Sequence, residues 1–211
     1  HFWSGKILDV KTPILAILDT DCAVGKRTTA RFIMESCQNR DIKTEIIYTG
    51  QTGWMQGYKH GFIFDATPND FVSGELERVI LECVEQSNPD LILLEGQSSL
   101  RNPSGPAGSE FILSGNANGV ILVHPIGRDY FVDLEEYQYK LPEIEKEIML
   151  IEAYDNKVIA IALNQENSNL DTLKENQKKL ENKLNIPVSI PLSEGVDKIV
   201  DLIKEEYIIE Q

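Results

Sequence analysis

The sequence predicts an α/β fold in which helices cover both faces of a mostly parallel β-sheet. Short apolar runs recur along the 211 residues, and segments with apolar residues at helical spacing separate them. This alternation is typical of parallel sheets, because each return to a parallel strand needs a crossover connection, usually a helix. Apolar residues make up 42% of the chain, which suffices for one continuous core in a large domain.

The first half of the chain contains three predicted strands and two predicted helices. Continuous apolar runs, as in strands buried on both faces of a sheet, cover residues 14–18 and 91–94, and residues 44–49 (TEIIYT) are predicted to form a further strand. Apolar residues recur at helical spacing over residues 25–40 and 69–86. Between them, residues 50–61 contain four glycines and are predicted to form a loop.

The second half keeps the same alternation. Its predicted strands are residues 119–124, 158–163 and 186–190. Its predicted helices begin near Pro142, at Leu170 and at Gly195, and the apolar residues of each are spaced to lie on one helix face. Pro142 suits the first turn of a helix, where a missing backbone N–H costs nothing.

Charge and cysteine content exclude several classes of partner and site. Acidic residues outnumber basic ones by 34 to 20, for a net charge of -14, which opposes binding to nucleic acid or an anionic membrane. The three cysteines form no CxxC pair, so neither structural zinc nor a disulfide framework is expected. No apolar run is long enough to span a membrane, and we expect a cytoplasmic protein that binds a small-molecule substrate.

The amino-terminal residues predict a domain boundary. The chain opens HFWSG, without a methionine or a signal-peptide pattern. We therefore expect residues 1–12 to be a lead-in from an upstream domain of the same chain, and residues 13–211 to form the α/β domain. Association into a homo-oligomer is left open by the sequence.

One strand-to-helix junction carries the most informative motif. Residues 19–29 (DTDCAVGKRTT) follow the first predicted strand and open the first predicted helix. This context suits a phosphate-binding loop, because loop N–H groups and the helix dipole converge on one point. The predicted cofactor-binding residues of this loop are Asp21, Cys22, Ala23, Val24, Gly25, Lys26, Arg27, Thr28 and Thr29.

The motif differs from the usual GxxxxGK[ST] pattern at two positions. Thr20 stands at the first glycine, and Arg27 follows Lys26 where serine or threonine is expected. Thr28 would then supply the hydroxyl for Mg²⁺, while Lys26 faces a terminal phosphate. An ordinary strand-to-helix turn is the alternative. Asp21 would repel phosphate, so we expect it to orient the loop or to meet a cation.

Glu95 is the leading candidate for a metal-binding carboxylate. It follows a buried strand, and carboxyl ends of parallel strands face the ligand crevice of an open α/β sheet. Thr28, Asp70 and Glu95 form the predicted Mg²⁺ set. Capping of a helix or loop is the alternative for Glu95, and helix capping for Asp70.

Four polar residues are predicted to contact the substrate: Gln51, Thr52, Arg101 and Arg128. The first two lie in the glycine-rich segment, which could close as a lid together with Lys59 or His60, or could be a plain surface loop. Both arginines follow strand ends, where they suit an anionic ligand or simply the surface.

His124 and Cys22 are candidates for proton transfer and nucleophilic chemistry. His124 ends a predicted strand and could be a general base, or a buried histidine with a structural partner. Cys22 lies near a helix N-terminus, which can depress a thiol pKa. The sequence pairs no base with it, so we do not expect nucleophilic catalysis by this thiol.

The phosphate loop resembles that of dethiobiotin synthetase-like P-loop proteins. More closely, the chain is similar to the C-terminal domain of the D-glutamate N-acetyltransferase family, long catalogued as a domain of unknown function. The supporting segments, in chain order, are Thr49–Gly53, Asn69–Gly74, Leu94–Leu100, and Val123-His124-Pro125 with Arg128. Asp19 and Ser98 stand where that family usually has glycine, and the family's N-terminal Rossmann-like domain has no counterpart in this sequence.

The resemblance implies a P-loop NTPase-like fold and an enzyme that N-acetylates D-glutamate or a similar amino acid from acetyl-CoA. Lys26, Glu95 and His124 are the predicted catalytic residues. The resemblance implies Mg²⁺ binding by Glu95 and a base-reading amide at Asn164, for which a turn asparagine is the alternative. The loop would serve ATP or GTP equally well. An ATP- and Mg²⁺-dependent carboxylate-activating ligase and a non-catalytic nucleotide-binding regulatory module are therefore the alternatives.

Overall fold

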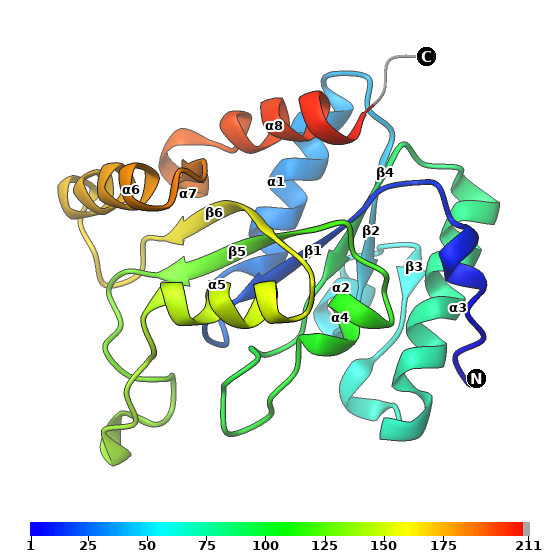
Figure 1. Cartoon of the computed structure of the whole chain (residues 1–211), viewed down its shortest axis with the longest axis horizontal. Helices are drawn as coiled ribbons and strands as arrows, with labels where there is room; N and C mark the ends of the chain where they lie inside the picture. Colours follow the sequence, from blue (N-terminus) through cyan, green and yellow to red (C-terminus); the bar gives the residue numbers. More distant parts are fainter. Residues whose placement is uncertain (209–211) are drawn as a thin grey trace.

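The computed structural model describes residues 1–208 and confirms the predicted α/β class. Seven strands form one sheet in the order β3-β2-β4-β1-β5-β6-β7, and every pairing is parallel (Figure 1). The strands are β1 (Ile14–Asp19), β2 (Thr44–Tyr48), β3 (His60–Gly61), β4 (Leu91–Glu95), β5 (Gly119–Pro125), β6 (Val158–Asn164) and β7 (Val188–Ser189).

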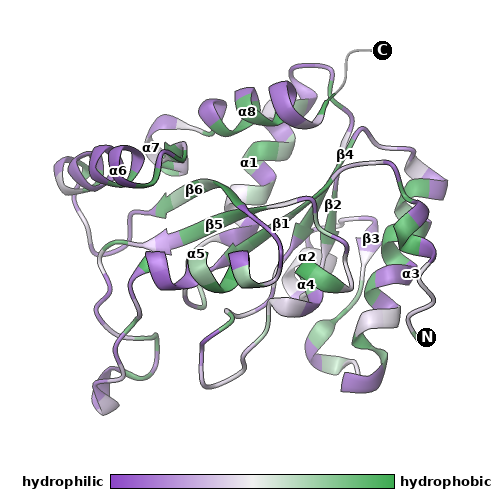
Figure 2. Ribbon diagram, in the orientation of Figure 1, coloured by the Kyte–Doolittle hydropathy of each residue, from purple (hydrophilic) through white to green (hydrophobic). Residues whose placement is uncertain are grey.

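Helices cover both faces of this sheet. They are α1 (Lys26–Gln38), α2 (Gln51–Met55), α3 (Asn69–Ser87), α4 (Ser109–Leu113), α5 (Ile144–Ala153), α6 (Leu170–Leu184), α7 (Pro191–Glu194) and α8 (Asp197–Tyr207). Helices α1 and α8 pack on one face, and α3, α4 and α5 pack on the other. Figure 2 shows green apolar residues along the strands and purple polar residues on the outer helix surfaces.

The strand register brings three loops together at one edge of the sheet. Strand β1 lies at the centre, with β4 and β5 as its neighbours. Ile17 pairs with Glu95 of β4, and Asp19 pairs with Val123 of β5. Because the strands are parallel, the segments that follow β1, β4 and β5 leave the sheet side by side. The phosphate loop therefore lies beside Glu95 and the segment after Val123.

The glycine-rich segment after β2 is more ordered than a loop. Residues 51–55 form α2, and residues 60–61 form the edge strand β3. His60 is buried there, and its Nε2 lies 3.0 Å from the Ser87 hydroxyl at the end of α3. A lid that carries His60 toward a ligand therefore does not fit the structure, because the His60 side chain is buried and contacts α3.

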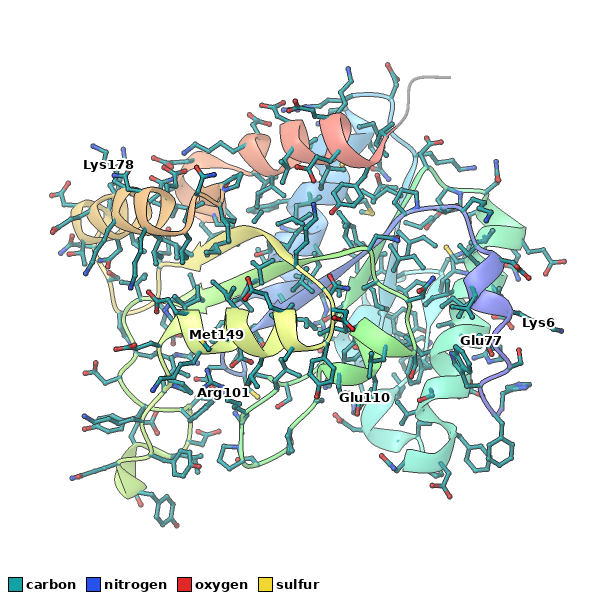
Figure 3. The ribbon with its side chains drawn as sticks, in the orientation of Figure 1. Lys6, Glu77, Arg101, Glu110, Met149 and Lys178 are labelled. Atoms are coloured by element: carbon teal, nitrogen blue, oxygen red, sulfur yellow. The ribbon has the colours of Figure 1, made fainter. Side chains whose placement is uncertain are left out.

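The amino-terminal residues pack onto the domain. Lys6–Asp9 form a short 3₁₀ helix, and Ile7 is fully buried in the core beneath α3. Glu77 of α3 accepts hydrogen bonds from the backbone N–H groups of Ser4 at 2.6 Å and Ile7 at 3.2 Å. In Figure 3 Glu77 faces this segment. Among residues 1–208, no helix has the length and apolar character that crossing a membrane requires.

Candidate functional site

The loop between β1 and α1 presents unpaired backbone donors. Gly25 has a φ of 94°, a left-handed conformation that glycine adopts without strain, and this turn starts α1 at Lys26. Within residues 1–208, the backbone N–H groups of residues 23–28 donate to no protein acceptor. Unpaired donors at the positive end of a helix dipole are the groups that attract anions at helix N-termini.

A cavity of about 360 Å³ lies over this loop. Its walls are formed by Cys22, Ala23, Val24, Gly25, Lys26, Arg27, Thr28, Glu95, Gln97 and Ser98. Seven of these residues belong to the predicted loop, and Glu95 was predicted beside it. Thr29 is buried behind the wall on α1. A larger, more open cavity of about 490 Å³ lies between α6 and α8, and no predicted site residue lines it.

Lys26 pairs with a buried carboxylate. Its ammonium group contacts Asp19 Oδ2, and the Ser98 carbonyl oxygen lies 3.4 Å away. Burial raises the pKa of the Asp19 carboxyl to about 7, although Lys26 opposes this shift. Near pH 7 the Asp19 carboxyl is therefore only about half ionised, so its ion pair with Lys26 is incomplete. A bound phosphate would compete with Asp19 for Lys26.

Arg27 pairs with the predicted metal ligand. Its Nη2 lies 2.6 Å from Glu95 Oε1, and only 4% of the Glu95 side chain is exposed. Burial raises the pKa of the Glu95 carboxyl, against the attraction of Arg27. Thr49 helps to hold the end of β4, because its hydroxyl donates to the Glu95 carbonyl oxygen at 2.8 Å.

Asp21 holds the loop from inside. It is fully buried and accepts hydrogen bonds from the N–H of Cys22 at 2.8 Å and of Val132 at 3.0 Å. Side chains of Arg128 at 2.8 Å and Asn102 at 3.2 Å complete its partners. With four donors around one carboxylate, Asp21 orients the loop and its charge is balanced.

Two other predicted residues brace the loop. The His124 Nδ1 atom lies 2.8 Å from the Thr20 hydroxyl, and burial lowers the pKa of His124 to about 4. Asn164 at the end of β6 donates from Nδ2 to the Val24 carbonyl at 2.8 Å, and its Oδ1 accepts the N–H of Glu166 at 2.7 Å. Both side chains therefore contact the loop or its flank.

The remaining predicted residues lie away from the cavity wall. Asp70 is exposed in the first turn of α3, and Gln51 and Thr52 are exposed on α2. Arg101 bonds through Nε to Glu147 Oε2 of α5 at 2.7 Å, and Figure 3 shows Arg101 below that helix. Within residues 1–208, no three His, Cys, Asp or Glu side chains gather as a metal site.

A second cavity of about 330 Å³ adjoins the first and shares Cys22, Gln97 and Ser98 with it. Its other walls are Phe64, Asp65, Ser104, Gly105, Pro106 and Ala107. At the shared wall, the Cys22 sulfur lies 3.3 Å from the Ser98 hydroxyl, and Asn102 Nδ2 lies 3.4 Å from that sulfur. The sequence alone assigned no site role to Gln97, Ser98 or Asn102, although the first two lie only two and three residues after the predicted Glu95.

Comparison with known proteins gives a consistent assignment. Residues 1–200 match the family described as a domain of unknown function, the DUF1611_C P-loop domain. Two curated relatives, from Pseudoalteromonas sp. and Tritonibacter scottomollicae, are both named D-glutamate N-acetyltransferase and are each 28% identical to this chain. The matches cover 94% and 86% of this chain but only 60% and 55% of the relatives, so the chain spans little more than half of their length.

Solved structures support the fold. The crystal structure of a DUF1611 family protein from Anabaena variabilis has a TM-score of 0.88 at 24% identity, covering 98% of this chain and 61% of that one. Hydrogenase maturation factor HypB from Archaeoglobus fulgidus shares the P-loop fold, with a TM-score of 0.56 at 12% identity over 94% of this chain and 92% of that chain. By its sequence match over residues 1–200, the chain belongs to the DUF1611_C P-loop domain family.

Proposed function

We propose that the chain binds a phosphate-bearing cofactor over residues 20–28 and takes part in N-acetyl transfer from acetyl-CoA to D-glutamate or a similar amino acid. One observation carries the binding step: residues 23–28, whose backbone N–H groups donate to no acceptor within residues 1–208, line one cavity together with the Lys26 side chain. Such a cluster of donors binds phosphate oxygens wherever the backbone presents it. The acetyl-transfer step rests on the two relatives' names.

The two adjoining cavities suit two reactants. We place the diphosphate of CoA over the loop, with Lys26 neutralising part of its charge. The acceptor would then lie in the second cavity, beyond the wall of Cys22, Gln97 and Ser98. In the transfer, the amine nitrogen attacks the thioester carbonyl and the carbon–sulfur bond breaks. The proton lost by the amine ends on the CoA thiol.

Roles for the predicted residues follow from their places. Lys26 and Glu95 act on the cofactor side, because both line the cavity over the loop. His124 and Asn164 brace the loop through Thr20 and Val24. A neutral imidazole that contacts Thr20 keeps the first loop residue in place without adding charge beside the phosphate.

Binding and turnover are tested separately. Isothermal titration of acetyl-CoA, ATP and GTP into the protein should show binding of at least one ligand. Lys26→Ala should weaken that binding by about tenfold to a hundredfold, since a hydrogen bond to a charged group contributes about 1.5–3 kcal/mol. Lys178→Ala, at an exposed position on α6, is the matched control and should leave binding unchanged.

Turnover decides between acetyl transfer and its alternatives. With acetyl-CoA and D-glutamate, release of free CoA thiol supports the transferase. Release of ADP and phosphate from ATP in the presence of a carboxylate substrate would instead support the ligase. Nucleotide binding with no turnover would support a regulatory module. Because the two relatives are longer than this chain, the same assay should also be run on a protein of their full length.

A further inference from the structure

Arg27 occupies the position in the loop that usually serves a metal. In phosphate loops the residue after the lysine is a serine or threonine whose hydroxyl oxygen ligates Mg²⁺. Here that residue is Arg27, the second residue of α1. A guanidinium has only N–H donors and stays charged at every accessible pH, so it cannot ligate a cation. It can bind an anion directly.

The carboxylate that would complete a metal site is already paired. P-loop proteins hold Mg²⁺ between the loop hydroxyl and an acidic residue on a neighbouring strand. Glu95, at the end of β4, has the place of that acid, and its Oε1 lies 2.6 Å from Arg27 Nη2. The positive charge of the Arg27 guanidinium thus already lies between the loop and Glu95, where other P-loop proteins hold the metal ion.

The other Glu95 oxygen, Oε2, faces α2. Oε2 is buried and lacks a hydrogen-bond partner within residues 1–208. It lies 3.4 Å from the position that a Cβ on Gly53 would take, so the backbone of α2 adjoins it. Mg²⁺ demands six oxygens at about 2.0–2.1 Å and retains several waters. Because the Glu95 side chain is buried and the Arg27 guanidinium already neutralises its charge, these residues do not fit the divalent ion that the fold family implies.

The third predicted ligand does not repair the site. Asp70 lies on the exposed first turn of α3 and forms no part of the cavity wall. Thr28 lines the cavity, but the one carboxylate beside it, Glu95, is ion-paired with Arg27 through Oε1. Of the predicted carboxylates, Asp70 is thus absent from the wall, and Glu95 is neutralised by Arg27.

We infer that this loop binds its phosphate ligand without a divalent cation, and that the Arg27 guanidinium takes the place of the metal. The inference rests on the proposed function. Held by Glu95, the planar fork of Arg27 offers its remaining N–H groups to phosphate oxygens beside Lys26. The class of ligand that fits is a diphosphate ester such as that of CoA, which binds intact. A triphosphate whose cleavage depends on Mg²⁺ does not fit.

Calorimetry in two buffers tests this inference. Acetyl-CoA and ATP are each titrated into the protein in EDTA and in millimolar Mg²⁺. The affinity for acetyl-CoA should differ by less than about twofold between the buffers, which is within about 0.4 kcal/mol. An affinity for acetyl-CoA that is about tenfold or more higher in Mg²⁺ than in EDTA would overturn the inference and leave the proposed binding function intact. Failure of both ligands to bind in both buffers would overturn the proposed function and the inference with it.

Substitution of Arg27 gives the second readout. Arg27→Thr restores the usual loop pattern and should weaken acetyl-CoA binding in EDTA by about tenfold or more, because a charged hydrogen-bond donor is lost. Arg31 lies one turn further along α1, is exposed and contacts Glu35 and the Phe32 ring, so Arg31→Thr is the control and should leave binding unchanged. Arg27→Thr with Glu95→Gln avoids an unpaired buried carboxylate and keeps the test valid if the single variant unfolds. Unchanged binding in EDTA by either Arg27 variant would overturn the inference.

Discussion

Arg128 holds the phosphate loop in place through an ion pair with Asp21. Arg128 Nη1 lies 2.8 Å from Asp21 Oδ2 and also 2.8 Å from the carbonyl oxygen of Cys22. One guanidinium group thus fixes both a buried carboxylate and the backbone of the residue that follows it. Glu166 contacts the other side of Arg128, so the arginine that the sequence assigned to the substrate is held within the protein.

Removing Arg128 should destabilise the protein strongly. Arg128→Ala leaves Asp21 charged and buried, and breaking a buried ion pair in this way costs about 3–5 kcal/mol. Chemical denaturation followed by circular dichroism measures the free energy of unfolding. Asp21→Asn should cost less, because the neutral amide no longer needs a counter-charge.

A surface arginine provides the comparison for Arg128. Arg40 contacts Asp201 and lies 2.7 Å from Asp197, and both carboxylates are largely exposed. Arg40→Ala should lower the free energy of unfolding by only about 0–1 kcal/mol, as exposed pairs do. Equal losses for Arg40→Ala and Arg128→Ala would show that burial of Asp21 has no part in the effect.

Asp19 should make stability depend on pH. Its pKa rises from 3.8 to about 7 on folding, so the native state binds the extra proton between these values. The free energy of unfolding then falls as pH rises through this window, with a slope of up to about 1.4 kcal/mol per pH unit from this group. Asp19→Asn removes the contribution. The variant's stability relative to the wild type should therefore increase from pH 4 to pH 7, and a constant difference would contradict the prediction.

His124 should stay neutral well below the usual range of histidine. Burial lowers its pKa from 6.5 to about 4, so the unfolded state binds the extra proton as pH falls below 6.5. This group therefore contributes stability that is present above pH 6.5 and is lost as the pH falls toward 4. Nuclear magnetic resonance of the ring protons, with His124→Asn to assign the signal, measures the midpoint. A midpoint near 6.5 would rule out the buried, neutral state.

Gly96 should not tolerate a side chain. A Cβ at this position would lie 2.6 Å from Leu18 Cδ2 and 2.7 Å from the carbonyl oxygen of Ile17. Gly96→Ala should therefore cost about 1–3 kcal/mol, the usual effect of overpacking. Gly105→Ala is the control, because a Cβ there meets nothing within 4 Å. Similar melting temperatures for the two variants would argue against close packing between β4 and β1.

Local patterns were enough to predict most of the architecture. Strands buried on both faces are continuous apolar runs, and helices such as α1 repeat their apolar residues every three or four positions, so both can be seen in the sequence. Helix α2 and strand β3 could not be seen in the same way. They are short and rich in glycine, and the packing of Gly53 and Gly61 against Tyr48 decides their shape.

The phosphate loop could be predicted because it is one continuous segment. The partners of its charged residues could not. Arg27 and Glu95 are 68 residues apart, and Asp21 and Arg128 are 107 residues apart. Each pair meets because β1 lies between β4 and β5, and no local pattern encodes that order. The sequence assigned Arg128 to an anionic ligand and could not show that it pairs with Asp21.

The packing of the first residues against Glu77 has a consequence for anyone who shortens this chain. Trimming before Ile14 looks harmless, since β1 starts there, yet it would remove Ile7 from the core and the two N–H donors from a buried carboxylate. The damage would appear on α3, which flanks the sheet edge far from the cut in sequence. A crystallisation or display variant should therefore keep residues 4–10, and fusions belong upstream of them.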